Sequence, residues 1–569
     1  MKKIPYGICN YRKLQEEGYV YVDKTSYLER LENVGSTLVY LRPGRFGKTL
    51  FTSMMYYYYD IKSKSLFDTL FKNTYVYQHP TEKKNKYYIL KLDFSGMDTG
   101  KEKNSELEEE FKKCLCLGFN DFMNKYSIEI NFDSNSSVPA MIKDFLSSFY
   151  QNNLKNNIDN KMYIMIDEYD NFTNAILEGD GTRFRSLVGN NGFIKSFYAA
   201  IKEYVGLGVV DRVFMTGICP ITLDSMTTGF NIATDISRDI RFTTMIGLTH
   251  EEVKSLLNEV EEEKQEEIYQ LMISNYDGYL FNKEQEEKSF NATLVMYFLN
   301  YYYAFKKIPD SLIDINIAFN YGKVENLIKL YQNNYYQDIL NDLFTTDTVT
   351  GILKEKFNLE YDFTRDDIIS LLYYFGYLTI GKENIFDNSI QFKIPNQVMK
   401  ETYNHYFVKI LSDMKITFDS NYLRECYKEL IVEGKINKIT NYIKEILFKV
   451  DNRDFIQFDE KYIKLMYFTL LCGNKNFNTY TEYPTNHGYI DVMLFKNGNY
   501  SKYDIMIELK YIKKSDYRKN KKLLQIKKEE AKKQINNYVK DERIPKENLK
   551  KYIVIFIGEK VEVIEELEK

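Results

Sequence analysis

Short apolar runs alternate with amphipathic stretches over the first third of the chain. The apolar runs predict strands at 36–41, 87–94, 162–166 and 212–216. Between them, apolar positions recur every three to four residues and predict helices at 48–59, 104–126, 138–154 and 193–205. Strands that alternate with helices in this way are typical of a parallel sheet covered by helices on both faces.

The middle third has a helical period only. It predicts helices at 250–260, 264–274, 292–305, 322–332 and 366–375. We interpret this region as a helical lid or adaptor, which could contain a winged helix. Closer to the C-terminal end, two strand-like runs within 488–510 flank the turn-forming residues 496–499 and predict a hairpin.

The chain has 569 residues, several times the usual length of a domain. The changes of period predict domains at 1–250, 251–420 and 421–569. Residues 421–569 carry 30 Lys and Arg against 23 Asp and Glu, a net charge of +7, and the total of −4 leaves −11 for the rest. The basic domain is where a polyanion would bind. No apolar run has the length of a membrane span or a signal segment, which predicts a cytoplasmic protein.

A phosphate-binding loop is predicted between the first strand and its helix. The segment Gly44, Arg45, Phe46, Gly47, Lys48 and Thr49 supplies backbone N–H groups at a helix N-terminus, a lysine for the outer phosphates and a hydroxyl for Mg²⁺. The usual pattern has a glycine where this chain has Arg42. A chance turn with the same residues is the alternative interpretation of this motif alone.

A second motif supports the first. The strand 162–166 ends in Asp167 and Glu168, at the sheet edge where parallel α/β proteins bind ligands. We assign Asp167 to Mg²⁺ and Glu168 to the base that polarises the attacking water, as phosphoryl transfer from ATP requires. Thr216, at the end of the next strand, could sense the γ-phosphate. A buried threonine that satisfies the backbone is the alternative.

These motifs together resemble the AAA-ATPase-like family of predicted P-loop proteins. The resemblance rests on Tyr21–Thr25, Leu41–Thr49, Ile166–Asp170, Thr216–Ile221 and Met245–Thr249, and covers about residues 4–330. In that family an arginine stands where Arg42 does, and Gly44 replaces a further arginine. The resemblance implies an ATPase-type fold with ATP and Mg²⁺ as ligands.

Carboxylates also gather near the C-terminal end. Strand alternation places Glu508 and Lys510 on one face, and a hairpin loop centred near 499–500 places Asp491 opposite Glu508. Two such carboxylates can hold Mg²⁺ or Mn²⁺ against a scissile phosphate, while Lys510 positions the water. A solvated ion pair on an edge strand would have the same sequence.

The arrangement resembles the PD-(D/E)XK nuclease superfamily over about residues 425–560. The matching positions are Glu460 on a helix as a further metal ligand, Glu482, Asp491, the Glu508-x-Lys510 pair, and Gln534 with Tyr538 on the following helix. Tyr489 replaces an arginine of that pattern. The resemblance implies a restriction-endonuclease-like α/β domain.

The sequence as a whole therefore predicts an α/β multidomain protein in which an ATPase is coupled to a metal-dependent nuclease. Its expected partner is nucleic acid, DNA more than RNA. We expect no membrane association, and an oligomeric assembly is compatible with the sequence. The alternative is a nucleotide-switched protein of defence or signalling whose C-terminal domain binds nucleic acid without cleaving it. In a third interpretation, neither site is catalytically active.

Overall fold

The chain forms two compact units. The first comprises Met1–Tyr336 and Thr350–Val398, and the second Gln337–Val349 and Met399–Lys569. The predicted domain boundaries near residues 250 and 420 stay predictions. The structure is a computed structural model that describes residues 3–98, 103–156, 161–171, 192–220, 230–259, 264–309, 311–314, 339, 342–343, 348–357, 363–384, 386–413, 418–450, 460–472, 474, 476–497, 501–558 and 560–567.

A five-stranded parallel sheet forms the centre of the first unit, which confirms the predicted architecture. Its strand order is β2-β3-β4-β1-β5, and all neighbouring strands are parallel. Because β4 lies between β1 and β3, the carboxyl ends of these three strands share one edge of the sheet. The strands are β1 (Thr37–Leu41), β2 (Tyr87–Asp93), β3 (Lys161–Asp167), β4 (Val210–Gly217) and β5 (Thr234–Asp235).

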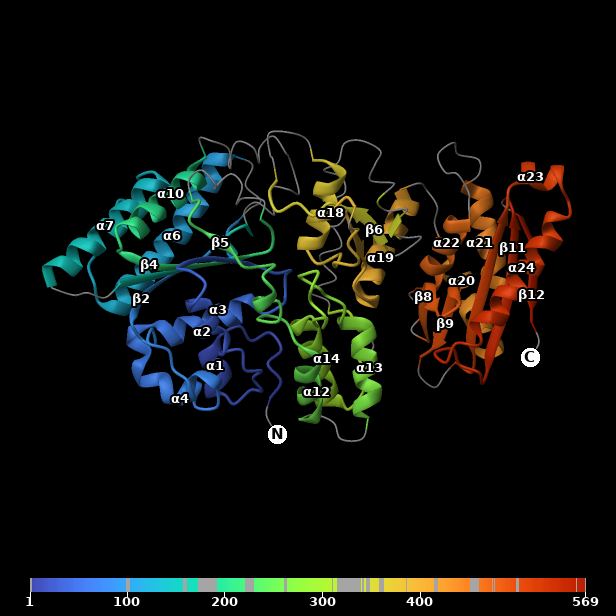
Figure 1. Ribbon diagram of the computed structural model, residues 1–569, viewed down its shortest axis with the longest axis horizontal. Helices are drawn as coiled ribbons and strands as arrows, with labels where there is room; N and C mark the ends of the chain where they lie inside the picture. Colours follow the sequence, from blue (N-terminus) through green and yellow to red (C-terminus); the bar gives the residue numbers. More distant parts are fainter. Residues whose placement is uncertain are drawn as a thin grey trace. The chain divides into compact units, whose positions relative to one another are not determined.

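Helices cover both faces of this sheet, with α6, α7 and α10 on one side and α1 to α4 on the other (Figure 1). The longer helices are α3 (Lys48–Tyr59), α6 (Asn104–Tyr126), α7 (Val138–Asn156) and α10 (Phe193–Gly206). They agree with the predicted ranges to within two residues. The short ones are α1 (Tyr11–Glu16), α2 (Tyr27–Glu32), η1 (Ile61–Leu66), α4 (Phe67–Phe71), α5 (Tyr75–Gln78) and η2 (Ile240–Phe242).

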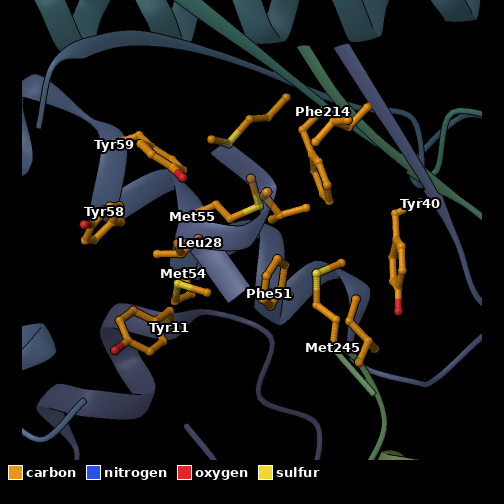
Figure 2. Close-up of a cluster of buried hydrophobic side chains, with 14 of the residues drawn as sticks. Tyr11, Leu28, Tyr40, Phe51, Met54, Met55, Tyr58, Tyr59, Phe214 and Met245 are labelled. Carbon is orange, nitrogen blue, oxygen red and sulfur yellow. The ribbon is translucent and has the colours of Figure 1, made fainter. Parts of the chain in front are cut away.

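The core beneath the sheet is rich in tyrosine, phenylalanine and methionine (Figure 2). Met54 and Met55 of α3 are fully buried there, as are Tyr58 of the same helix and Phe214 of β4. One face of α3 thus fixes the helix against the sheet. Since α3 starts directly after the predicted phosphate loop, this packing also fixes the position of the loop.

The middle region is helical, as predicted. Its elements are α12 (His250–Asn258), α13 (Gln265–Tyr276), α14 (Ala292–Phe305), α18 (Arg365–Tyr374) and α19 (Gln397–Asp413), with a two-stranded sheet of β6 (Thr348–Gly351) and β7 (Ile390–Lys393). The helix predicted at 322–332 lies outside the described residues.

The second unit contains a mixed sheet of order β12-β11-β10-β9-β8. Only β10 and β11 are parallel, and the other neighbours are antiparallel. The strands are β8 (Phe477–Thr485), β9 (Gly488–Lys496), β10 (Asp504–Ile512), β11 (Leu549–Ile557) and β12 (Lys560–Glu566). The helices are α20 (Ser420–Glu433), α21 (Asn437–Val450), α22 (Glu460–Cys472), α23 (Lys514–Lys519) and α24 (Leu523–Tyr538).

Helices also contact both faces of the mixed sheet. On one face, Ile535 of α24 shares a core with Met506 of β10 and Ile553 of β11. On the other, Tyr552 donates a hydrogen bond of 2.8 Å to the carbonyl oxygen of Gly434, which ends α20. In the part of the chain that the structure describes, no helix has both the length and the apolar character needed to cross a membrane.

Candidate functional sites

The loop between β1 and α3 has the backbone expected for binding an anion. Arg45 (φ 70°) and Gly47 (φ 108°) adopt left-handed conformations and turn the chain before α3 begins at Lys48. The first N–H groups of the helix have no intrahelical acceptor and are directed out of its N-terminus. A Cβ added at Gly44 would meet nothing within 4 Å, so the loop is open at this position.

Lys48 lies across this loop with only 3% of its surface exposed. Its Nζ donates to the carbonyl oxygens of Arg42 (3.0 Å) and Pro43 (3.2 Å). The same atom is 3.5 Å from Oε1 of Glu168, and Thr49 follows on α3. The structure therefore brings together the predicted phosphate lysine and the predicted base. Glu168 itself is left-handed (φ 52°), a conformation that is uncommon outside glycine and is often found at functional sites.

Asp167 is buried at the end of β3 and is oriented by Thr216. The Thr216 hydroxyl donates to Oδ1 of Asp167 at 2.6 Å, across neighbouring strands. Burial raises the pKa of Asp167, while this hydrogen bond lowers it. Thr216 thus bonds to a side-chain carboxylate, and its role as a sensor of the γ-phosphate stays a prediction.

A third carboxylate, Asp170, has a role that was not predicted. Its Oδ2 accepts hydrogen bonds from the N–H groups of Ile218 (2.9 Å) and Cys219 (2.7 Å), just after β4. Burial, followed by the charge of Glu168, raises the pKa of Asp170 to about 6. A Cβ at Gly217 would lie 2.5 Å from Asp170 Oδ1, so this close approach requires glycine. Asp170 therefore holds the end of β4 beside the end of β3.

The phosphate loop also packs against the middle region. The Phe46 ring is buried and meets Tyr279 edge-on, with 4.9 Å between ring centroids. The carbonyl oxygen of Arg45 accepts a 2.6 Å hydrogen bond from the Thr293 hydroxyl at the start of α14. The side chain of Phe46 is thus a packing group, and its backbone is the part that remains for phosphate binding.

Arg42, the residue that breaks the usual loop pattern, is buried in the same contact. Its guanidinium carbon lies 4.3 Å from the ring centroid of Tyr40 and 3.9 Å from that of Phe281. Its Nη1 atom donates to the carbonyl oxygen of Ser237 (2.7 Å), and its Nη2 to that of Phe242 (3.2 Å). Arg42 therefore joins the base of the loop to segments far away in the sequence.

We expect Arg42→Ala to lower the free energy of unfolding of the first unit by about 3–5 kcal/mol. The substitution leaves a cavity between two rings and removes charge-assisted hydrogen bonds from buried carbonyl oxygens. Urea unfolding followed by far-UV circular dichroism measures the loss. Arg45→Ala, which truncates an exposed arginine of the same loop, is the control and should cost less than about 1 kcal/mol. Equal losses in the two variants would contradict the prediction.

In the second unit, three carboxylates lie side by side across neighbouring strands. In the antiparallel pairing of β9 with β10, the last paired residues are Val492 and Ile507. Continued by one residue, this register places Asp491 opposite Glu508. The register of β8 and β9 places Glu482 opposite Asp491. Residues opposite each other in a sheet share a face, so Glu482, Asp491 and Glu508 form one acidic row. This agrees with the predicted pairing of Asp491 and Glu508.

Two lysines neutralise parts of this row. Lys510 Nζ is 2.7 Å from Oε1 of Glu508, as strand alternation predicted. Lys464 of α22, which was not predicted, places its Nζ 2.5 Å from Oδ1 of Asp491 and 2.5 Å from Oε1 of Glu482. Glu460, one turn earlier on α22, is 3.5 Å from the same ammonium group. Glu460 is thus linked to the acidic row by Lys464, the ammonium group that it shares with Glu482 and Asp491.

The chemistry of the row is suited to a divalent cation near Glu508. This residue is 1% exposed, and its Oε2 is buried without a hydrogen-bond partner. Asp491 Oδ2 is fixed by the N–H group of Leu509 at 2.7 Å. Among the described residues, no group of three or more His, Cys, Asp or Glu side chains is arranged to hold a metal ion. Glu508, through its unpaired Oε2, and Asp491 opposite it are the side chains that would hold the predicted metal.

Comparison with known families matches the two regions that contain these candidate sites. Residues 5–227 match the family described as predicted AAA-ATPase, and residues 458–566 match the PD-(D/E)XK nuclease superfamily. The chain joins an AAA-ATPase-like region to a PD-(D/E)XK nuclease superfamily domain. It is also 24% identical over 263 residues to an uncharacterized protein in the vnfD 5' region of Azotobacter chroococcum mcd 1, with 45% of each chain covered. The chain thus spans less than half the length of that relative.

The PD-(D/E)XK domain should lose stability as the pH rises towards 8. Burial, and then the charge of Asp491, raises the pKa of Glu508 from 4.5 to about 8. Between these values the folded domain holds a proton that the unfolded chain has lost, so raising the pH favours unfolding. We expect the thermal midpoint in chelator to fall between about pH 5 and pH 8 more steeply in the wild type than in Glu508→Gln. Equal slopes for the two proteins would contradict this.

The region around the PD-(D/E)XK row includes α24 and an exposed aromatic ring. Gln534 Nε2 donates to the Tyr538 hydroxyl at 3.3 Å, and Gln534 Oε1 is buried without a partner. Tyr489, which replaces the arginine of the pattern, is 60% exposed. Of the lysine-rich segment 513–533, Lys528 and Lys532 pair with Glu565, so part of this segment is neutralised locally.

The motif Tyr21–Thr25 of the AAA-ATPase-like region binds the segment around the start of α12. Lys24 Nζ donates to the carbonyl oxygen of Thr244 (2.9 Å) and to Glu252 (2.8 Å). Glu252 also closes a capping box with Thr249 at the start of α12. The motif therefore holds α12 of the middle region against the N-terminal segment.

Proposed function

We propose that the chain binds and hydrolyses ATP at the edge of the parallel sheet. Lys48 Nζ would turn from the loop carbonyl oxygens to the outer phosphates. Thr49 and Asp167 would hold Mg²⁺, and Glu168 would accept a proton from the attacking water. This assignment is supported by the 3.5 Å approach of Glu168 to Lys48 and by the hydrogen bond that orients Asp167.

We further propose that the PD-(D/E)XK domain cleaves phosphodiester bonds in DNA. Asp491 and Glu508 would hold Mg²⁺ or Mn²⁺, which supplies a Lewis acid and a bound water of lowered pKa. Lys510 Nζ would orient the water and offset the negative charge that develops on the phosphate. The observation that carries this proposal is the buried Glu508, with one oxygen on Lys510 and the other unpaired.

ATP would control the nuclease through the middle region. The phosphate loop contacts this region through Phe46, Arg45 and Arg42. A change of loop geometry when Lys48 moves to a nucleotide would therefore act on α14 and on the segment around Phe281. Lys513 and Lys514 follow β10 directly and would contact the backbone phosphates of the proposed DNA substrate.

The experiment that tests this function is a cleavage assay with the purified full chain. Circular plasmid and single-stranded DNA are incubated with Mg²⁺ or Mn²⁺, with and without ATP, and with a chelator as the control. Cleavage that requires the metal supports the nuclease, and a further dependence on ATP supports control by the first unit. ATP hydrolysis and DNA binding without cleavage under any condition would instead favour a nucleotide-switched DNA-binding protein.

A further inference from the structure

The charges around the acidic row of the PD-(D/E)XK domain do not balance. Among the described residues, four carboxylates meet there, those of Glu460, Glu482, Asp491 and Glu508, and two ammonium groups pair with them. With every group ionised the site carries a charge of −2. Like charges opposite each other in a sheet are destabilising, so a bound cation or a bound proton would relieve this excess.

The two ends of the row differ in what their oxygens already bind. At the Glu482 end, the Lys464 ammonium group has three N–H donors and three carboxylates within 3.5 Å, and Lys464 is only 6% exposed. This end is therefore saturated by a buried cation that belongs to the chain. The helix α22 fixes its position, because Glu460 and Lys464 are one turn apart.

At the Glu508 end, an oxygen remains unused. Glu508 Oε1 is bound by Lys510, while Oε2 is buried and has no partner. A buried carboxylate oxygen without a partner is costly unless a cation or donor reaches it. The unused oxygen thus lies at the Glu508 end of the row, whereas the carboxylates at the other end already share the Lys464 ammonium group.

We propose that this site holds one divalent cation, between Asp491 and Glu508, and that Lys464 supplies the positive charge where a second metal ion would otherwise lie. The inference rests on the proposed metal-dependent nuclease and adds a role for Lys464. Two-metal nuclease sites hold their ions about 3.5–4 Å apart between shared carboxylates. Here Asp491 is the shared carboxylate, and one of its two neighbouring positions is occupied by an ammonium group.

The number of bound Mn²⁺ ions tests the proposal without relying on activity. The full chain is titrated with Mn²⁺ by calorimetry in the absence of nucleotide, and sites at the row are counted as those that Asp491→Asn removes in the same background. We expect one such site in the wild type, two in Lys464→Gln and one in Lys464→Arg, which keeps the charge. Lys444→Gln, an exposed lysine of α21, is the matched control and should keep one.

Electron paramagnetic resonance of the wild type makes the test independent of how the variants fold. At saturating Mn²⁺ the spectrum at the row should be that of an isolated ion, because a pair about 4 Å apart would be spin-coupled. Two coupled ions in the wild type would overturn the role of Lys464 and leave the nuclease proposal intact. One site in a folded Lys464→Gln would also overturn that role. No Mn²⁺ at the row in any protein would overturn the nuclease proposal together with the inference.

Discussion

Glu508→Gln is expected to lower metal-dependent DNA cleavage at least about 100-fold relative to the wild type. The amide keeps the shape of the side chain but removes the charge from a carboxylate of the row whose Oε2 is buried without a hydrogen-bond partner. A metal ion contributes several kcal/mol of stabilisation to a phosphoryl transition state, and each 1.36 kcal/mol is about a factor of ten in rate. Initial rates of plasmid nicking with Mn²⁺ measure the loss.

The fold should survive this substitution. The raised pKa of Glu508 means that its carboxyl group is largely protonated at neutral pH without metal, so a neutral amide resembles the native state. ATP hydrolysis by the first unit should also be unchanged. Glu547→Gln, at an exposed position of the same unit, is the control and should cleave like the wild type. Cleavage by Glu508→Gln at the wild-type rate would remove Glu508 from the active site.

The longer helices of the first 305 residues could be predicted from the sequence because each buries one stripe of side chains, whereas α19, α20 and α21 were not predicted. The helices predicted at 104–126 and 292–305 form at Asn104–Tyr126 and Ala292–Phe305. Strands with weak apolar signals were missed. β5 has two residues, both exposed, and β12 is an edge strand with exposed and half-buried positions. The order of the strands joins segments far apart in the chain and has no local signal.

At the candidate sites, too, contacts between residues close in the chain could be predicted and contacts between distant residues could not. The pairing of Asp491 with Glu508 could be predicted because both lie on one hairpin, whose register follows from short-range geometry. Lys464 could not be predicted, since a lysine on an amphipathic helix is usually solvated. Its partners Glu482 and Asp491 lie on strands that follow the helix, and only the folded domain brings them to one ammonium group.

The role of Arg42 also could not be predicted from the sequence, although the residue itself was noticed there. The sequence identifies it as a break in the phosphate-loop pattern, and the physical reason lies about 200 residues later, at the carbonyl oxygens of Ser237 and Phe242 and the ring of Phe281. A local sequence pattern indicates which residues can bind a phosphate. It does not indicate which distant segments the base of the loop contacts in the folded protein.

The second large effect is expected at the nucleotide site. Glu168→Gln should lower ATP hydrolysis about 10²–10⁴-fold, the range for loss of a general base. ATP binding should be retained, because the loop backbone, Lys48 and Thr49 remain. Phosphate release and calorimetric titration with ATP measure the two properties separately. Lys48→Ala should lose both, and Glu106→Gln, at an exposed position of α6, should lose neither. Unchanged hydrolysis in Glu168→Gln would show that another group activates the water.

The same variant separates two ways in which ATP could act on DNA cleavage. A variant that binds ATP without hydrolysing it keeps the loop in its nucleotide-bound geometry, in which Lys48 no longer bonds to the carbonyl oxygens of Arg42 and Pro43. If that geometry alone activates the nuclease through the middle region, Glu168→Gln should cleave DNA in ATP at least as fast as the wild type. If turnover is required, the variant should cleave as slowly as the wild type without ATP. Because the phosphate loop contacts the middle region through Phe46 and Arg45, and these contacts respond to loop geometry rather than to hydrolysis, we expect the first result.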